Sequence, residues 1–377
     1  MDVVALSEKP NHCAAQGVFV PHPILDQPHR LTRLDPSDMI RKVLDLPAQF
    51  QDARSRVLAH APRLSPKGVK QVIVSGLGGS AISGDLLRSL TWKKAPFAVT
   101  VNRNYLLPAW AGKDSLVVAA SYSGGTEETL SVFRQARARR LRILALTSGG
   151  ALEARARQAK VPVLSFPGGL PPRAALGYSF ATLLTALETL GLLPSFQADF
   201  DETLEGMTRL ASLYGPLSPT ARNPAKLLAL FLKDKLPVIY AGQDHLDSVG
   251  LRWKTQLNEN AKQMALLNLV PEMNHNEILG YAFPEKLTRR MAVVLLGHPQ
   301  GDHPRIRRRL ELVKGLVAPK AAGLTEIKAQ GRSLLAQMIS LVYLGDFTSV
   351  YLAYLKKVDP TPTPLIDELK NMLARKI

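Results

Sequence analysis

A loop rich in hydroxyl groups and glycine lies between the apolar run 116–120 and a helical pattern, and it carries Ser121, Ser123 and Thr126. The first N–H groups of a helix lack backbone partners and carry partial positive charge. The two glycines of the loop let the main chain approach a ligand closely. The loop therefore predicts a binding site for a small phosphorylated molecule, without a Walker lysine. The alternative is an ordinary helix cap formed by Thr126 and Glu127.

A second glycine-rich loop follows the β-type run 71–75 and ends in Gly79 and Ser80. Its spacing is G-x-G-G rather than G-x-G-x-x-G, and no acidic residue ends a second strand about twenty residues later, so nicotinamide binding is not favoured. Ligands of parallel sheets bind beyond the carboxyl ends of the strands. Gly79 and Ser80 are therefore predicted to face the Ser121 loop, the alternative being a glycine needed only for packing.

Three positions further along the chain form a candidate acid/base set. Arg173 follows two prolines at the start of a helical run, and Glu259 and His275 are each flanked by asparagines. A carboxylate and an imidazole in one pocket can exchange protons with a substrate, and an arginine on a stiff loop can stabilise an anion. The alternatives are a surface arginine, a surface glutamate paired with Lys262, and a histidine beside a helix capped by Asn276.

Short β-rich runs alternate with helical stretches through most of the chain, which predicts right-handed crossovers and mainly parallel sheets. One of the helical stretches is expected over 246–264, and the predicted strands are 71–75, 97–101, 116–120, 143–146, 161–166, 236–241, 266–269, 291–296 and 324–327. The α/β pattern stops at a polar connector and then resumes, so we expect two doubly wound, flavodoxin-like parallel-sheet subdomains and a C-terminal helical segment. The predicted division is an N-terminal extension at 1–34, a first domain at 35–193, a helical connector at 194–224 and a second domain at 225–377. An apolar stripe within 341–355 is expected to face the core or a partner.

The composition of the chain argues against a membrane protein, a secreted disulfide-bonded protein and a nucleic-acid-binding protein. The chain has 377 residues, 46% hydrophobic and 21% charged, with no run of eighteen apolar residues and no secretory signal pattern. Cys13 is the only cysteine, which excludes an intramolecular disulfide, and the expected location is cytoplasmic. The net charge of +17 comes from basic residues scattered through helical segments, which favours solvated faces over nucleic-acid binding.

Six motifs occur in an order found in one family. The chain resembles the bifunctional phosphoglucose/phosphomannose isomerases of the sugar isomerase (SIS) domain superfamily, from about residue 35 to the C-terminus. The motifs are Gly78-Gly-Ser-Ala-Ile82, Ser121-Tyr-Ser-Gly-Gly-Thr-Glu-Glu-Thr129, Pro172-Arg173, Trp253-Lys-Thr-Gln-Leu-Asn-Glu-Asn260, Asn274-His-Asn-Glu277 and Asp359-Pro-Thr-Pro-Thr-Pro-Leu-Ile-Asp-Glu-Leu-Lys370.

The resemblance implies a role for each matching residue. Glu259 resembles the family's proton-transfer base, and Arg173 the group that stabilises the enediolate. It further implies ring opening by His275 and Lys370, with phosphate ligands at Gly79, Ser80, Ser121, Ser123 and Thr126 and a threonine near the second sugar carbon at Thr363. It also implies a homodimer in which His275 crosses the subunit boundary. The family usually has asparagine where Gly125 stands, so a side-chain contact from that position is missing here.

These residue types fit aldose–ketose isomerisation without a metal or a cofactor. One carboxylate can carry a proton between the first two carbons through a cis-enediol, and no hydride leaves. We therefore predict that glucose 6-phosphate and mannose 6-phosphate, the expected substrates, are interconverted with fructose 6-phosphate, with no role for membranes or nucleic acid.

Three alternatives are weighed against this prediction. One is a non-catalytic SIS-domain regulator that binds sugar phosphates. A metal-dependent isomerase and an amidotransferase-type isomerase are the others, but Cys13 lacks the context of a glutamine-hydrolysing domain. The possible metal ligands are His298, Asp302 and His303, or Asp244, His245 and Asp247, and neither set has a recognised ligand spacing.

Overall fold

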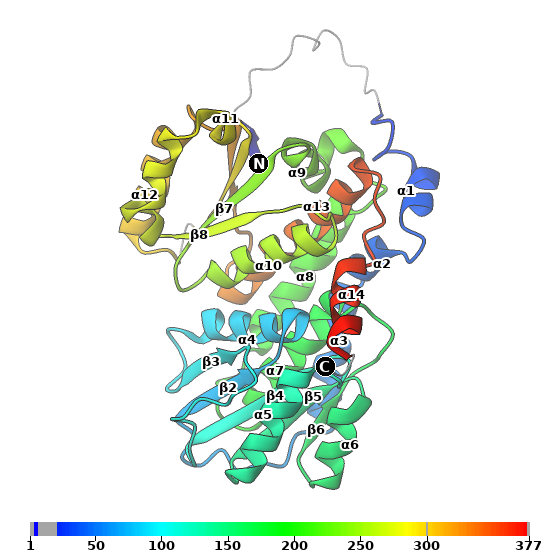
Figure 1. Ribbon diagram of the computed structural model, residues 1–377, viewed down its shortest axis with the longest axis vertical. Helices are drawn as coiled ribbons and strands as arrows, with labels where there is room; N and C mark the ends of the chain where they lie inside the picture. The colour runs from blue at the N-terminus through cyan, green and yellow to red at the C-terminus, as the bar shows by residue number, and fades with distance from the viewer. Residues whose placement is uncertain (1–3, 7–20, 299–300, 375–377) are drawn as a thin grey trace.

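The computed structural model describes residues 4–6, 21–298 and 301–374, and the rest of the predicted N-terminal extension lies outside this part of the chain. Two sheets lie one above the other, with helices between them and around them (Figure 1). This is the predicted architecture of two doubly wound parallel-sheet subdomains, and the fold prediction is confirmed.

The first sheet has the strand order β3-β2-β4-β5-β6, and all of its neighbouring strands are parallel. Its central strands are buried because helices cover both faces, which explains why they are nearly continuous apolar runs. The predicted strands are present, with ends that shift by up to two residues. The bounds are β2 Gln71–Ser75, β3 Ala98–Asn102, β4 Ser115–Ser121, β5 Arg142–Thr147 and β6 Val163–Ser165.

The second sheet has the order β1-β10-β9-β7-β8, parallel except at β1. Strand β1, Val4–Leu6, pairs antiparallel with β10 at the edge. It falls in the predicted extension 1–34, where no strand was expected, because three residues are too few to show a sequence period. The other bounds are β7 Leu236–Gly242, β8 Leu266–Val270, β9 Met291–Gly297 and β10 Gly323–Lys328.

The helices connect the strands and fill the space between the sheets (Figure 1). Up to the end of the first sheet they are α1 Pro28–Leu34, α2 Met39–Leu44, α3 Leu46–Ala59, α4 Gly78–Thr91, α5 Glu127–Ala138, α6 Gly150–Gln158, the 3₁₀ turn η1 Pro172–Ala174 and α7 Leu176–Thr189. They continue with α8 Gln197–Tyr214, η2 Thr220–Arg222, α9 Pro224–Leu232, α10 Asp247–Glu259, η3 Glu272–His275, η4 Glu277–Ala282, α11 Glu285–Thr288, α12 Pro304–Val317, α13 Leu334–Leu355 and α14 Pro364–Ala374.

Helix α10 is shorter than the helix predicted over 246–264, because it ends at Glu259. Lys262 takes a left-handed φ of 50°, and the Gln263 N–H donates to the Leu257 carbonyl at 3.0 Å. This bond folds the chain back onto the last turns of α10. Glu259 therefore lies in the last turn of α10 rather than inside a longer helix.

Helix α13 is buried on every side from 335 to 355, so the predicted stripe within 341–355 faces the core, and the other faces of the helix are buried as well. It packs against α8, α9 and α10, which surround it. By length and composition α13 could cross a membrane, but the whole apolar window is packed inside the protein. Its one carboxylate, Asp346, accepts hydrogen bonds from Arg252 of α10 at 3.0 and 2.8 Å, which ties the two helices together.

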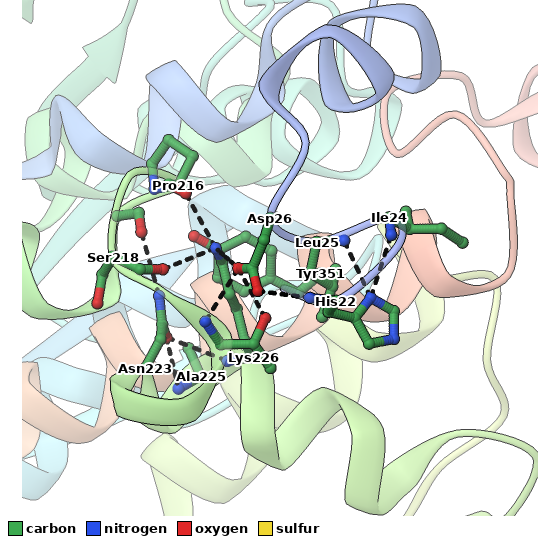
Figure 2. A network of polar contacts seen from close by, with 12 residues as sticks. His22, Ile24, Leu25, Asp26, Pro216, Ser218, Asn223, Ala225, Lys226 and Tyr351 are labelled. Carbon is green, nitrogen blue, oxygen red and sulfur yellow. Dashed lines mark hydrogen bonds and ion pairs between the residues drawn. The ribbon is translucent and has the colours of Figure 1, made fainter. Parts of the chain in front are cut away.

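A buried polar network attaches the segment before α1 to the start of α9 (Figure 2). Lys226 is fully buried and donates to Asp26 at 3.0 Å and to the carbonyls of Pro216 and Ser218 at 2.9 and 2.7 Å. Burial lowers the pKa of Lys226. Burial alone would raise the pKa of Asp26, but hydrogen bonds from His22, Lys226 and Thr220 outweigh it and lower the pKa. Residues 21–34 are therefore fixed to the connector and the second sheet's helices.

Candidate active site

The hydroxyl-rich loop joins β4 to α5 at the carboxyl end of the first sheet. The hydroxyls of Ser121 and Thr126 are 2.8 Å apart, and the Thr126 N–H points at the Ser121 oxygen at 3.4 Å. Ser123 is exposed, and its oxygen accepts the Gly125 N–H at 3.3 Å. The loop therefore presents hydroxyl groups of three residues at the start of a helix.

The helix-cap alternative does not describe this loop. Thr126 occupies the N-cap position of α5, yet its side chain makes no capping hydrogen bond. Gly124 has a φ of 68°, and a Cβ there would lie 1.9 Å from the Gly149 carbonyl oxygen of the next loop. Only glycine fits at this position, and the turn leaves the first N–H groups of α5 without a side-chain acceptor.

The two glycine-rich loops are in contact, as predicted. The Ser80 hydroxyl accepts the Tyr122 N–H at 3.0 Å, which joins the start of α4 to the Ser121 loop. Gly79 packs against the turn η1, since a Cβ on Gly79 would lie 2.6 Å from the Pro172 carbonyl oxygen. Gly79 and Ser80 therefore link the hydroxyl loop on one side to the loop that carries Arg173 on the other.

Arg173 is buried, with 4% of its surface exposed, and its guanidinium joins two distant segments, the end of α10 and the bend before α14. Its Nε donates to the Asn260 side chain at 2.6 Å, and its Nη2 donates to the carbonyls of Pro360 and Thr361 at 2.8 and 2.7 Å. The Arg173 carbonyl in turn accepts from Arg252 of α10 at 2.6 Å. Because the guanidinium is held on several sides, its position is fixed by the fold.

Glu259 lies beside this guanidinium, with Oε2 at 3.4 Å from Nη1 of Arg173. Its side chain is 26% exposed, so a ligand can reach the carboxylate. Burial lowers the pKa of Arg173, and the charge of Glu259 opposes that shift. Asn260 is fully buried and donates to the Ser349 hydroxyl at 2.9 Å, which anchors the end of α10 to α13.

Lys262 lies next to the site. The sequence had suggested Lys262 only as a surface ion-pair partner of Glu259. Its Nζ donates to main-chain carbonyls instead, to Glu259 at 2.9 Å and to Pro360 at 3.0 Å. Burial, followed by the nearby charge of Arg173, lowers its pKa to about 8. The Pro360 carbonyl therefore accepts from both cations, and Lys262 adds a positive charge next to the carboxylate.

The remaining predicted site residues are not joined to Glu259 or Arg173 by hydrogen bonds within the described part of the chain. His275 is exposed at the end of η3, and Lys370 is exposed on α14. Thr363 directly precedes α14, and its hydroxyl lies 3.4 Å from the Asp367 carboxylate. The bend that carries the Pro360 and Thr361 carbonyls leads into Thr363, so Arg173 also fixes the approach to α14.

The two sets of possible metal ligands do not assemble into a metal site. Over residues 4–6, 21–298 and 301–374, no three His, Cys, Asp or Glu side chains are grouped in a way that could hold a metal ion. Asp247 bonds Arg88 at 2.5 Å and the Ser89 hydroxyl at 2.8 Å, and Asp302 accepts the His298 N–H at 2.9 Å.

Comparisons with known proteins find relatives over most of the chain. Residues 221–373 match the model of the bacterial phospho-glucose isomerase C-terminal SIS domain. The bifunctional phosphoglucose/phosphomannose isomerase of Caldicellulosiruptor bescii is 42% identical over 336 residues, which cover 89% of this chain and 99% of the relative. The enzyme of the same name from Aquifex aeolicus is 33% identical and covers 81% of this chain and 91% of its own.

A solved structure supports the fold. A hypothetical protein of Thermus thermophilus superposes with a TM-score of 0.68 at 16% identity and covers 92% of both chains. The 42% identity to the Caldicellulosiruptor bescii enzyme extends over nearly its whole length, and the C-terminal domain matches the same family. This chain belongs to the family of bifunctional phosphoglucose/phosphomannose isomerases.

Proposed function

We propose that this protein interconverts glucose 6-phosphate and mannose 6-phosphate with fructose 6-phosphate. The observation that carries the proposal is the contact of Glu259 with Arg173, whose turn packs on Gly79 next to the hydroxyl loop. A base, a cation and a phosphate-binding loop are thereby linked by direct contacts. The names of the curated relatives support the same reaction.

The proposed chemistry begins with Glu259 as the base. The carboxylate removes the proton from the second carbon of the open-chain aldose and returns it to the first carbon, on the same face of a cis-enediol. Both epimers at the second carbon lead to the same enediol, so a site that admits both orientations converts glucose and mannose phosphates alike. Glu259 needs no metal for this step, because it only accepts and donates a proton.

Arg173 stabilises the negative charge that develops on the enediolate oxygens. Its guanidinium is already in place and largely shielded from water, so little reorganisation is needed when the charge appears. The phosphate of the substrate binds to the hydroxyls of Ser121, Ser123 and Thr126 and to the free N–H groups of α5. Ser80 completes the phosphate site from the start of α4.

His275 and Lys370 open the sugar ring in this proposal. Both side chains are exposed in a single chain, and a partner subunit would bring His275 to the site. We therefore propose a homodimer with shared active sites. The exposed position of His275 supports this arrangement, because it leaves the side chain open to a neighbouring subunit.

Purified protein is expected to convert both aldose phosphates to fructose 6-phosphate at unchanged rates in excess EDTA, since every proposed proton carrier is a side chain. A coupled assay on each substrate, with and without chelator, measures this. A sugar-phosphate-binding regulator would bind the same molecules without turnover. Loss of activity in EDTA that returns with a divalent cation would show that the reaction needs a metal.

The rate at saturating substrate is expected to fall several-fold as the pH rises through about 8, where Lys262 loses its proton. The reason is that the charge of Lys262 lies beside Glu259 and stabilises the same enediolate as Arg173. Lys262→Arg keeps the charge, so the fall should move to higher pH. Lys356→Arg is the control, because Lys356 lies nearby and donates to the Lys262 carbonyl. A pH profile unchanged by Lys262→Arg would exclude this role.

A further inference from the structure

The second sheet repeats the topology that places the phosphate-binding loops on the first. In the first sheet β2 lies between β3 and β4. Successive strands are therefore added first on one side of β2 and then on the other, and the two glycine-rich loops follow β2 and β4. In the second sheet β7 lies between β8 and β9 in the same way. Ligands of doubly wound sheets bind where the strand order reverses. The corresponding place is the pair of loops that follow β7 and β9.

A cavity of about 340 Å³ lies at that place. His245, from the loop after β7, and His298, directly after β9, line it together with the end of α4 and the start of α13. The volume is within the range of small-molecule sites. The cavity is distinct from the proposed active site, because no residue of the hydroxyl loop, the Arg173 turn or the end of α10 lines it.

The described lining of the cavity is cationic. Lys93, Lys94 and Arg332 contribute to it, and the lining contains no carboxylate. Lys94 and Arg332 have carboxylate partners at 3.8 and 3.6 Å, Asp199 and Glu202, which lie outside the lining. A cavity with this charge favours an anionic ligand.

Two imidazoles in the wall each have one nitrogen, Nδ1, without a hydrogen-bond partner, while the His298 ring also interacts with the Gln337 side chain. His245 and His298 are 5% and 4% exposed, and their ring centroids are 5.8 Å apart. Nδ1 of each ring has almost no accessible surface and no hydrogen bond, and Nδ1 of His298 lies against Gly301, which also lines the cavity. Burial, followed by the charge of His245, lowers the pKa of His298 to about 4, so its ring is neutral near pH 7. Buried unpaired groups are rare, and a neutral imidazole can donate a hydrogen bond to a phosphate oxygen.

We propose that this cavity binds a second small molecule through its phosphate group. The lysines and Arg332 supply the charge, and the imidazoles supply directed hydrogen bonds. The chemistry differs from that of the first sheet, where hydroxyls and helix N–H groups are the donors. Each α/β domain would then hold one phosphorylated ligand at its own point of strand reversal.

The test uses inorganic phosphate as the probe in the full-length protein. Ser123→Asp places a carboxylate in the hydroxyl loop and blocks phosphate at the active site, so any remaining phosphate must bind elsewhere. Calorimetry of this variant should show one phosphate per chain. Adding Lys93→Gln, Lys94→Gln and Arg332→Gln should weaken that binding at least tenfold. The three side chains are exposed or at the surface, so the fold should be retained.

A matched control removes the same charge elsewhere. Lys113→Gln, Lys160→Gln and Lys320→Gln change three exposed lysines outside the cavity and should leave phosphate binding in the Ser123→Asp background unchanged. In ¹³C-histidine-labelled protein, phosphate should also shift the His245 and His298 signals, assigned with His245→Asn and His298→Asn. Absence of binding in the Ser123→Asp variant, equal weakening by both triple variants, or unmoved signals of these two histidines would overturn the proposal. Turnover of hexose 6-phosphates by the wild type is a separate measurement that none of these outcomes alters.

Discussion

Glu259→Gln is expected to lower kcat for glucose 6-phosphate and mannose 6-phosphate by about 10³-fold, the size typical of a lost general base. Glutamine has the same shape and can still accept the hydrogen bond of Arg173, but it cannot take a proton from carbon. Glu259 is not part of the hydroxyl loop that is proposed to bind the phosphate, so the affinity for a non-reacting hexitol 6-phosphate should change little. Turnover of each substrate and calorimetry with the inhibitor measure both effects.

The control for this variant is Glu205→Gln, which makes the same exchange on an exposed side chain of α8 and should leave kcat unchanged. Loss of only one of the two activities in Glu259→Gln would mean that a different base serves each epimer. Wild-type turnover in the variant would remove Glu259 from the mechanism altogether, even though it is the carboxylate that contacts Arg173.

The part of the site that follows strand ends could be predicted from the sequence. Parallel strands place their carboxyl ends at one edge, and the hydroxyl and glycine residues stand directly after β2 and β4. Residue type and position in the pattern were therefore enough to predict that Ser80 lies near the Ser121 loop. The hydrogen bond from the Tyr122 N–H to the Ser80 hydroxyl confirms this contact. The flanking asparagines of Glu259 also pointed to a special position, and Asn260 is the one that binds Arg173.

The contacts that fix Arg173 could not be predicted, because they run to main-chain carbonyls. Every residue has a carbonyl, so the residue types at 360 and 361 do not indicate that Pro360 and Thr361 bind a guanidinium 187 or 188 positions away. The early end of α10 has a similar cause. It depends on the left-handed turn at Lys262, and lysine has no intrinsic preference for that conformation.

The burial of every face of α13 could not be predicted from the sequence for a different reason. A stripe at helical spacing is visible only when the other faces are polar, and α13 places small or hydrogen-bonded polar residues such as Ser349 and Asp346 against its neighbours. Asp346 accepts from Arg252 of α10, and Ser349 accepts from Asn260, the residue directly after α10. The central helix therefore does more than fill the core, since it holds the carboxylate of the proposed site through Arg252 and Asn260.

Arg173→Lys should lower kcat/KM for both substrates by about 10²-fold or more, the cost of losing a preorganised donor to a developing oxyanion. Lysine keeps the charge, but it cannot reproduce donation to Asn260 and to the Pro360 and Thr361 carbonyls from one planar group. The segment before α14 loses its attachment at the same time. Steady-state kinetics on both hexose phosphates, with unfolding curves for the same preparations, measure the two consequences.

Arg54→Lys separates the catalytic effect from the stability effect. Arg54 is also buried, bonds Glu188 at 2.5 Å and lies over the Phe200 ring at 4.4 Å, but it belongs to α3 and contacts no proposed site residue. Its replacement should cost about 1–3 kcal/mol of stability and leave kcat/KM near the wild-type value. Equal losses of kcat/KM in the two variants would mean that Arg173 acts only by holding the fold. A loss confined to Arg173→Lys is expected, because of the two guanidinium groups only that of Arg173 lies beside Glu259, the proposed base.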